Sequence, residues 1–460
     1  MPELPEVETI VRHLSNVLKD KKIVSIDILR DKNILTAPSS LLSLVGESFK
    51  NVTRRAKYLI FHLTNDNVIV AHLRMEGKYY LEDSKEIKKH DLLIFSFSDD
   101  TYLHYNDVRK FGTIEVYKEN NYLECKSLSS LGEEPFSMSY ESFYDGLQKR
   151  ANTPIKEALL DQKFIVGIGN IYDSEILYKV NVNPRETCSN ISFSKAKEIL
   201  SETRKILEKA IEEGGSTIRS YHPEAGKSGH MQDSLLVYGK ENSPCPRCAS
   251  PIRRIFIGGR SSFYCPRCQK EENRPYVIGI TGPIAAGKST VSNYLKDKGY
   301  VILDSDKYAH ESYEDKDVKK KLKENFPTAF RNDVIDRKAL LGIVSKDKEK
   351  MSILNSIIHP YVFKRTREGI KANPNGKVVI DMPLLLDTPF INECDLIIGV
   401  TSPVKEREKR LEERGVNVKE SLALNSSFPM VKLKKEAAII IETTGTLEEL
   451  KSKLDAYPFI

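Results

Sequence analysis

The spacing of hydrophobic residues changes twice within the first 214 positions. Between residues 7 and 18 apolar residues recur at intervals of three and four, which predicts an amphipathic helix. Residues 23–117 contain short apolar or alternating runs between polar turns, which predict antiparallel strands packed as a β-sandwich. The helical spacing returns in residues 139–214, where the predicted helices are 143–147, 155–160, 171–180 and 194–213.

A different alternation begins after a short polar linker at residues 271–275. Apolar strands alternate with helical stretches from there to the end of the chain, which predicts a parallel sheet in an α/β domain. The predicted strands are 276–281, 300–303, 378–380, 396–400 and 439–441. We therefore expect a multidomain protein with an all-β part, a helical part and an α/β part.

Composition places the chain among globular proteins. It has 460 residues, of which 40% are hydrophobic and 30% charged, and its net charge of +6 permits a nucleic-acid partner without requiring one. The sequence contains neither a long uninterrupted apolar run nor a signal-peptide pattern. We expect a cytoplasmic protein with no membrane partner.

Four of the seven cysteines form two Cys-x-x-Cys pairs separated by sixteen residues. Two such thiolate pairs predict one tetrahedral, structural Zn²⁺ site, in which all four ligands come from the protein. Arg253, Arg254 and Arg260 lie between the pairs, on a predicted ribbon suited to phosphates, although a solvated basic hairpin has the same pattern. The expected ligands are Cys245, Cys248, Cys265 and Cys268, and we expect Cys125, Cys188 and Cys394 to be ordinary buried thiols.

The first residues offer an unusual nucleophile. Removal of Met1 would leave Pro2 as a free secondary amine, which titrates near pH 8 and can form a Schiff base with a sugar aldehyde. Glu3 stands beside it as an acid/base candidate, although a Pro-Glu pair also starts ordinary helices. Further along, the turn at residues 167–170 (Gly-Ile-Gly-Asn) could bind a phosphate through its amides, or could simply connect two helices.

The α/β part opens with a phosphate-binding pattern. Gly282, Gly287, Lys288 and Ser289 form a Gly-x-x-x-x-Gly-Lys-Ser motif, followed by Thr290, between a predicted strand and a predicted helix. Its amides would hold nucleotide phosphates, Lys288 would reach the β and γ oxygens, and Ser289 would bind Mg²⁺. Just past the next predicted strand, Asp304 is a candidate base for an attacking hydroxyl, or else a helix N-cap.

Residues 1–269 resemble bacterial formamidopyrimidine-DNA glycosylase, a base-excision repair enzyme. The resemblance rests on PELPEVE, RRAKYL, AHLRMEGKY, NDVRKFGT, LGEEPF, GIGNIYDSEIL and the finger ending in CPRCQ. It implies a β-sandwich, a helix–two-turns–helix module and a zinc finger that together bind damaged double-stranded DNA, with the lesion, 8-oxoguanine or a formamidopyrimidine, flipped out of the helix.

The resemblance also implies roles for individual residues. Pro2 would attack the sugar, Glu3 would act as acid/base, helped by Glu6, and Lys57 would contact a phosphate and assist. Met75, Arg109 and Phe111 would fill the gap left by the flipped base, while Asn170 and Arg260 would bind phosphates; as isolated residues, Met75 and Phe111 could equally be core side chains. The loop from Thr217 to Gln232 would close over that base.

The remainder of the chain resembles dephospho-CoA kinase, through IGITGPIAAGKST, VILDSD, DRKALLGIV, LNSIIHP and VVIDMPLLLD. The resemblance implies transfer of the ATP γ-phosphoryl group to the 3′-hydroxyl of dephospho-CoA, with Asp304 as base and Arg410 and Arg414 on ATP phosphates. Several positions depart from the family pattern, namely His310, Asp387, the missing glutamine before the lid arginines, and the segments at 437–438 and 443–445. A degenerate ATP-binding module or a nucleoside monophosphate kinase-like domain is therefore the alternative for this part.

Together these features predict a bifunctional, monomeric protein that uses Zn²⁺, ATP and Mg²⁺. A non-catalytic, DNA-binding zinc protein is the alternative for the first part, and the intact Pro2, Glu3 and Lys57 argue against it. The expected domains are a catalytic β-sandwich at 1–130, a helical DNA-binding module at 131–225, a zinc finger at 226–272 and a kinase-like domain at 276–460.

Overall fold

The computed structural model describes residues 1–215, 231–332, 334–345, 347–418, 421–422, 428–458 and 460. The chain divides into two compact units, which are described separately. The first contains residues 1–240 and 256–264, and the second contains residues 241–255 and 265–460.

A β-sandwich follows the first helix, as the alternating pattern predicts. One sheet has the strand order β1-β6-β7-β5 and the other β2-β3-β4-β8, and neighbouring strands are antiparallel. Phenylalanines from both sheets, Phe49, Phe61 and Phe95, meet edge to face between them. The elements are α1 (Leu4–Leu18), β1 (Ile23–Ile28), α2 (Pro38–Leu42), β2 (Phe49–Arg55), β3 (Tyr58–Leu63), β4 (Asn67–His72), β5 (Lys78–Glu82), β6 (Asp91–Phe97), β7 (Tyr102–Asn106) and β8 (Thr113–Lys118).

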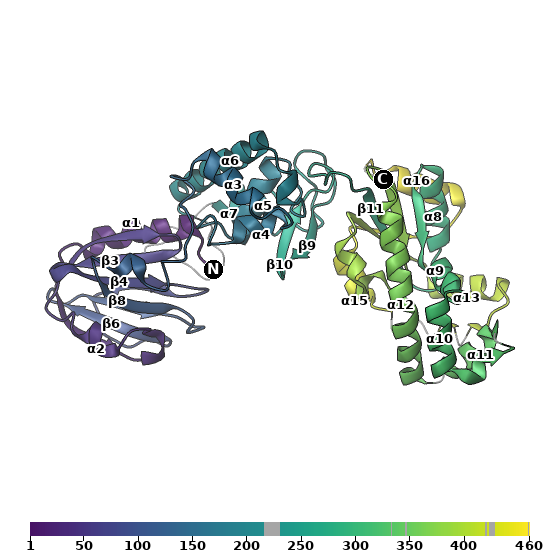
Figure 1. Ribbon diagram of the computed structural model, residues 1–460, viewed down its shortest axis with the longest axis horizontal. Coiled ribbons are helices and arrows are strands. Elements are labelled where there is room, and N and C mark those ends of the chain that lie inside the picture. Colours follow the sequence, from purple (N-terminus) through teal and green to yellow (C-terminus); the bar gives the residue numbers. More distant parts are fainter. Residues whose placement is uncertain (216–230, 333, 346, 419–420, 423–427, 459) are drawn as a thin grey trace. The chain divides into compact units, whose positions relative to one another are not determined.

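A helical module completes most of the first unit (Figure 1). Its buried core combines residues of four helices with Leu4 from α1, so the front of the chain is anchored in this module as well as in the sandwich. The helices are α3 (Tyr140–Gln148), α4 (Ile155–Leu160), α5 (Asn170–Lys179), α6 (Phe193–Glu212) and the short α7 (Met231–Ser234).

The cysteine-rich region forms a two-stranded ribbon of β9 (Arg253–Ile257) and β10 (Arg260–Tyr264). The division between the units passes through this ribbon, because the turn belongs to the first unit and the four cysteines belong to the second.

The rest of the second unit is an α/β fold around five parallel strands in the order β12-β15-β11-β16-β17. Two apolar clusters fill its core, and the buried residues of these strands are divided between them. All five predicted strands are present, and a small hairpin, β13 (Phe330–Arg331) with β14 (Val334–Ile335), was not predicted.

The five strands are β11 (Tyr276–Thr281), β12 (Val301–Asp304), β15 (Lys377–Asp381), β16 (Leu396–Thr401) and β17 (Ile439–Glu442). The helices are α8 (Lys288–Asp297), α9 (Ser305–Ser312), α10 (Lys316–Asn325), α11 (Arg337–Val344), α12 (Lys348–Lys371), α13 (Val404–Glu413), α15 (Met430–Glu436) and α16 (Leu447–Asp455). Among the described residues, no helix is both long and apolar enough to span a membrane.

Candidate active sites

The first site forms where the front of the chain meets the N-terminus of α5. Pro2 is buried, and Glu3 is the N-cap of α1, where its backbone N–H donates to Glu6 Oε2 over 2.8 Å. The Glu3 carboxylate accepts hydrogen bonds from the amides of Gly169 (2.7 Å) and Ile171 (2.9 Å), and a longer one from Tyr172 (3.4 Å). These amides therefore hold a carboxylate of the protein itself.

This contact bears on the two alternatives for the 167–170 turn, a phosphate site or a plain connection between helices. The turn does join two helices and does present the N-terminus of α5, where anions are stabilised. The anion that occupies this helix N-terminus is Glu3. Only glycine at position 169 allows the close approach, because a Cβ there would lie 2.3 Å from Glu3 Cδ.

Lys57 reaches the same place from the turn between β2 and β3. Its Nζ donates to the carbonyl of Ile168 over 2.7 Å, and the side chain is buried. Burial raises the pKa of Glu3 to about 7 and lowers the pKa of Lys57 to about 8, while the opposite charge of each partner limits both shifts. Both groups can therefore gain or lose a proton near neutral pH.

Glu6 and Tyr172 form a supporting contact that the sequence pattern did not reveal. The Tyr172 hydroxyl donates to Glu6 Oε1 over 2.6 Å, and both side chains are buried. This bond ties α1 to α5 directly beside Glu3. Burial also lowers the pKa of the amino group at the front of the chain, on Met1, below its ordinary value.

The three residues expected to fill a gap in DNA are on the surface. Met75 is 38% exposed and Phe111 is 54% exposed, which excludes the alternative that they are core side chains. The Arg109 guanidinium lies 4.9 Å from the centre of the Phe111 ring, so a cation and an apolar ring are presented together.

Two further candidates lie close to the Glu3 and Lys57 pair. Asn170 is the first residue of α5, and its amide donates to Ser261 Oγ in β10 over 3.2 Å. Arg260 begins β10, is exposed, and its charge helps to lower the pKa of Lys57. The loop from Thr217 to Gln232 lies almost entirely outside the described residues, which exclude 216–230.

The four predicted cysteine ligands converge. Their sulfur atoms all lie within 4.8 Å of one another, with 3.9 Å between Cys245 and Cys268 and 3.5 Å between Cys248 and Cys265. A tetrahedral Zn²⁺ with bonds of about 2.3 Å requires sulfur atoms about 3.8 Å apart, so the geometry fits this metal. As expected, the three remaining cysteines are buried free thiols.

The phosphate-binding loop lies between β11 and α8. Gly287 has a left-handed φ of 94°, which glycine adopts without strain, and it caps α8. Lys288 Nζ donates to the carbonyls of Gly282 (2.9 Å) and Pro283 (3.1 Å), and burial lowers its pKa. The Lys288 side chain is therefore folded back onto the phosphate-binding loop.

Acidic residues surround this lysine at the carboxyl ends of two strands. Asp304 ends β12 and is in register with Asp381, which ends β15. Asp381 Oδ2 accepts from Ser292 Oγ over 2.6 Å, and burial raises its pKa. Asp304 does cap α9, through its Oδ1.

Asp381 was missed in the sequence, although an aspartate ending the strand beside the P-loop strand is a recognisable signal. Carboxylate and hydroxyl oxygens are the ligands that Mg²⁺ prefers, so Ser289 and Asp381 fit this metal.

Of the two arginines expected on ATP phosphates, Arg410 lies against the loop. Its guanidinium donates to the carbonyls of Ala285 (3.1 Å) and Thr443 (2.6 Å). Arg407, which was not predicted, donates to Ile284 O over 2.9 Å. The charge of Arg414 helps to lower the pKa of Lys288.

Two positions that depart from the kinase pattern have partners of their own. Nδ1 of His310 lies 3.5 Å from the guanidinium of Arg337. Asp387 pairs with Lys432 at 2.8 Å.

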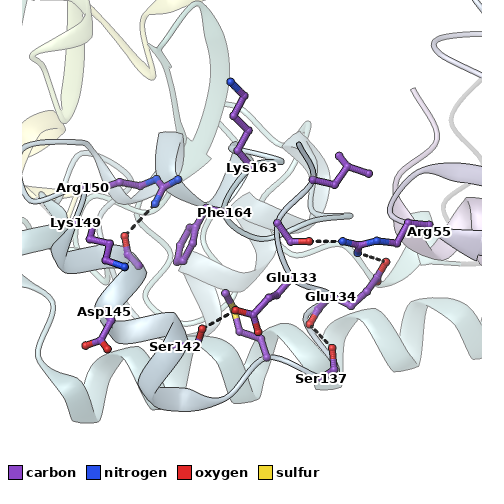
Figure 2. A pocket seen from close by; sticks show the side chains of 14 residues that line it. Arg55, Glu133, Glu134, Ser137, Ser142, Asp145, Lys149, Arg150, Lys163 and Phe164 are labelled. Carbon is purple, nitrogen blue, oxygen red and sulfur yellow. Dashed lines mark hydrogen bonds and ion pairs between the residues drawn. The ribbon is translucent and has the colours of Figure 1, made fainter. Parts of the chain in front are cut away.

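A separate hollow of about 640 Å³ lies between the β2 end of the sandwich and the helical module (Figure 2). Its arginines are engaged internally: Arg55 donates to Gly132 O and Glu134, and Arg150 to Asp161. Glu133 accepts from Ser142 over 2.6 Å. The hollow lacks Pro2, Glu3 and Lys57, and we assign it no role.

The Glu3–Lys57 site, the four-cysteine site and the P-loop define a class: a zinc-finger protein joined to a P-loop kinase fold. Models of the formamidopyrimidine-DNA glycosylase N-terminal domain, its H2TH domain, and the zinc finger found in FPG and IleRS match residues 1–114, 131–222 and 242–270. The dephospho-CoA kinase model matches residues 276–449.

Individual relatives agree. The formamidopyrimidine-DNA glycosylase of Streptococcus mutans is 44% identical over 275 residues, which are 59% of this chain and 100% of that protein. The Bacillus subtilis protein of the same description is 42% identical over 279 residues, again 59% and 100%.

Two solved structures of the Lactococcus lactis protein, one with a Fapy-dG containing DNA and one with an abasic site containing DNA, have TM-scores of 0.55 and 0.56 at 37% and 38% identity. Each covers 58% of this chain and 100% of the solved chain. The chain belongs to the formamidopyrimidine-DNA glycosylase family and continues into a dephospho-CoA kinase domain.

Proposed function

We propose that the chain carries two activities. The first part is a DNA glycosylase and abasic-site lyase that excises oxidised purines, namely 8-oxoguanine and formamidopyrimidines. The second part transfers the γ-phosphoryl group of ATP to the 3′-hydroxyl of dephospho-CoA. One observation carries the first activity: Glu3 is held by α5 amides beside Lys57 at the front of the chain.

In the glycosylase reaction, the nucleophile is the ring nitrogen of Pro2, freed by removal of Met1. It attacks the sugar C1′ and the bond to the base breaks. The C1′–O4′ bond then opens, O4′ takes a proton, and an iminium links the Pro2 nitrogen to C1′. Glu3, with a pKa of about 7, can give a proton to the departing fragment and take one back. The iminium acidifies the C2′ hydrogen. Its loss expels the 3′ phosphate, and a second elimination expels the 5′ phosphate, so the strand is cut.

The surrounding residues position the DNA. Lys57, Asn170 and Arg260 supply donors and positive charge for phosphates, and their proximity to Glu3 supports this role. The exposed Met75 and Phe111 would replace stacking lost when the lesion flips out, and Arg109 would hydrogen-bond the orphaned base. We propose that the protein acts on damaged duplex DNA as a monomer.

In the kinase reaction, the loop amides and Lys288 would hold the ATP phosphates. Ser289 and Asp381 would bind Mg²⁺, which neutralises phosphate charge. Asp304 is in register with Asp381, and it caps α9 through Oδ1 alone. Its other carboxylate oxygen would accept the proton of the attacking 3′-hydroxyl. Arg410, against the loop, would move onto the transferred phosphoryl group.

Two assays on the full chain test these proposals. A duplex with one 8-oxoguanine should be cut by the wild type and left intact by Pro2→Gly, whose primary amine lacks the ring; equal cutting would reject the proline mechanism. ATP with dephospho-CoA should yield coenzyme A. Turnover of a nucleoside monophosphate alone would assign the alternative substrate, and no turnover would leave an ATP-binding module.

A further inference from the structure

A buried arginine of the zinc module is bonded to the kinase fold. Arg253, the first residue of β9, has no exposed surface. Its guanidinium donates to the backbone carbonyls of Ile391 (3.0 Å), Cys394 (3.2 Å) and Glu436 (3.4 Å). All four residues belong to the second compact unit, which contains the cysteines as well as the α/β fold.

The position of these carbonyls explains why an arginine suits the contact. Glu436 is the last residue of α15, and Ile391 lies in a short 3₁₀ helix, Pro389–Asn392. Carbonyls at the end of a helix lack a partner within the helix and attract a cation. The fixed fork of a guanidinium can serve several of them together, which the single nitrogen of a lysine cannot do.

Other side chains hold the same two kinase segments. Asn242, in the zinc module, donates to the carbonyl of Lys435 over 3.1 Å, and Arg254 lies 3.4 Å from the Glu436 carboxylate. From the linker, Arg274 donates to both carboxylate oxygens of Asp395 over 3.0 and 2.9 Å. Asp395 in turn accepts from the amide of Val277 in β11, the strand that leads into the P-loop.

The fold of the cysteine site fixes the backbone position of Arg253. The amide of Cys245 donates to Ser250 O over 2.8 Å, and the amide of Asn242 donates to Ile252 O over 2.8 Å. The loop between the first two cysteines is therefore closed immediately before Arg253. A metal held by the four sulfurs would keep this loop closed, since a structural Zn²⁺ contributes directly to folding.

We propose that the base of the zinc module, formed by Asn242, Arg253 and Arg254, is the docking surface for the kinase domain. Zinc and the Arg253 guanidinium hold the module and the segments 391–395 and 435–436 in one folding unit. The metal site of the repair half thereby stabilises the kinase half, in addition to any role in DNA binding.

Hydrogen exchange measured by mass spectrometry on the full chain tests this docking without using either activity. The informative peptides cover residues 389–397 and 430–438, and a peptide from α8 reports on the kinase fold away from the contact. In Arg253→Met we expect exchange at 389–397 and 430–438 to be at least tenfold faster than in wild type. Arg253→Lys should have a smaller effect, because it retains the charge but loses the fork.

The matched control is Arg267→Met, an exposed arginine between the last two cysteines, which should exchange as wild type does. Removing zinc from the wild type should reproduce the effect of Arg253→Met. Faster exchange in α8 as well would show that docking stabilises the whole kinase fold. Wild-type exchange rates in Arg253→Met or in the zinc-free protein, or equally fast exchange in Arg267→Met, would overturn the proposal.

Discussion

Replacing Glu3 by glutamine tests whether this carboxylate is poised to exchange protons. Burial raises its pKa to about 7 from an ordinary value of 4.5. Between these values the unfolded chain has lost the proton that the folded chain keeps, so stability falls as pH rises. The stabilising contribution is fully present below pH 4.5 and lost as pH passes through 7. At about 1.4 kcal/mol per pKa unit, the loss amounts to roughly 3 kcal/mol.

The pH dependence is the diagnostic quantity, because the absolute stability of Glu3→Gln mixes two effects. Glutamine does not titrate, so this loss disappears. In wild type the backbone amides of Gly169 and Ile171 both donate to the Glu3 carboxylate. The NH₂ group of glutamine would face one of these amides, and an unsatisfied buried donor costs about 1–3 kcal/mol at every pH. We therefore expect the stability of wild type relative to Glu3→Gln to fall by roughly 3 kcal/mol between pH 4.5 and 7.

Urea unfolding at each pH, with pulsed hydrogen exchange read on peptides from α1 and α5, isolates the free energy of this half of the protein. Glu141→Gln is the control, because Glu141 is exposed at the start of α3 and its replacement should leave the pH dependence of wild type unchanged. A difference between wild type and Glu3→Gln that stays constant from pH 4.5 to 7 would refute the reasoning. Glu3 would then be an ordinary ionised helix cap.

Three further changes separate the two halves. Gly169→Ala should abolish lesion cutting, because its Cβ would meet Glu3 Cδ at 2.3 Å, while coenzyme A formation stays at the wild-type rate; retained cutting would contradict the Glu3 assignment. Lys57→Met should slow cutting by about a hundredfold, as expected for loss of a charged donor, measured by single-turnover kinetics. Lys288→Met should abolish phosphoryl transfer to dephospho-CoA and leave cutting unchanged; loss of both activities would contradict separate sites.

The sequence predicted most of the architecture, because the β-sandwich, the parallel sheet and the main helices follow from apolar periodicity. The spacing of the two cysteine pairs likewise predicted that the four sulfur atoms lie together. Contacts between residues far apart in the sequence could not be predicted. Nothing local to the 167–170 turn indicates that the Gly169 amide donates to Glu3, 166 residues away. The same holds for Tyr172 with Glu6, and for Arg253, whose three carbonyl partners lie far along the chain. The roles of the site residues stay predictions.

The central claim is that the mature front of the chain is a proline nucleophile, and borohydride trapping tests it most directly. The full chain is incubated with a duplex containing one abasic site, reduced with sodium borohydride, digested and mapped by mass spectrometry. We expect a covalent sugar adduct on the nitrogen of Pro2, with Met1 absent from that peptide. An adduct on a lysine instead, or tight binding of the duplex with no adduct, would contradict it.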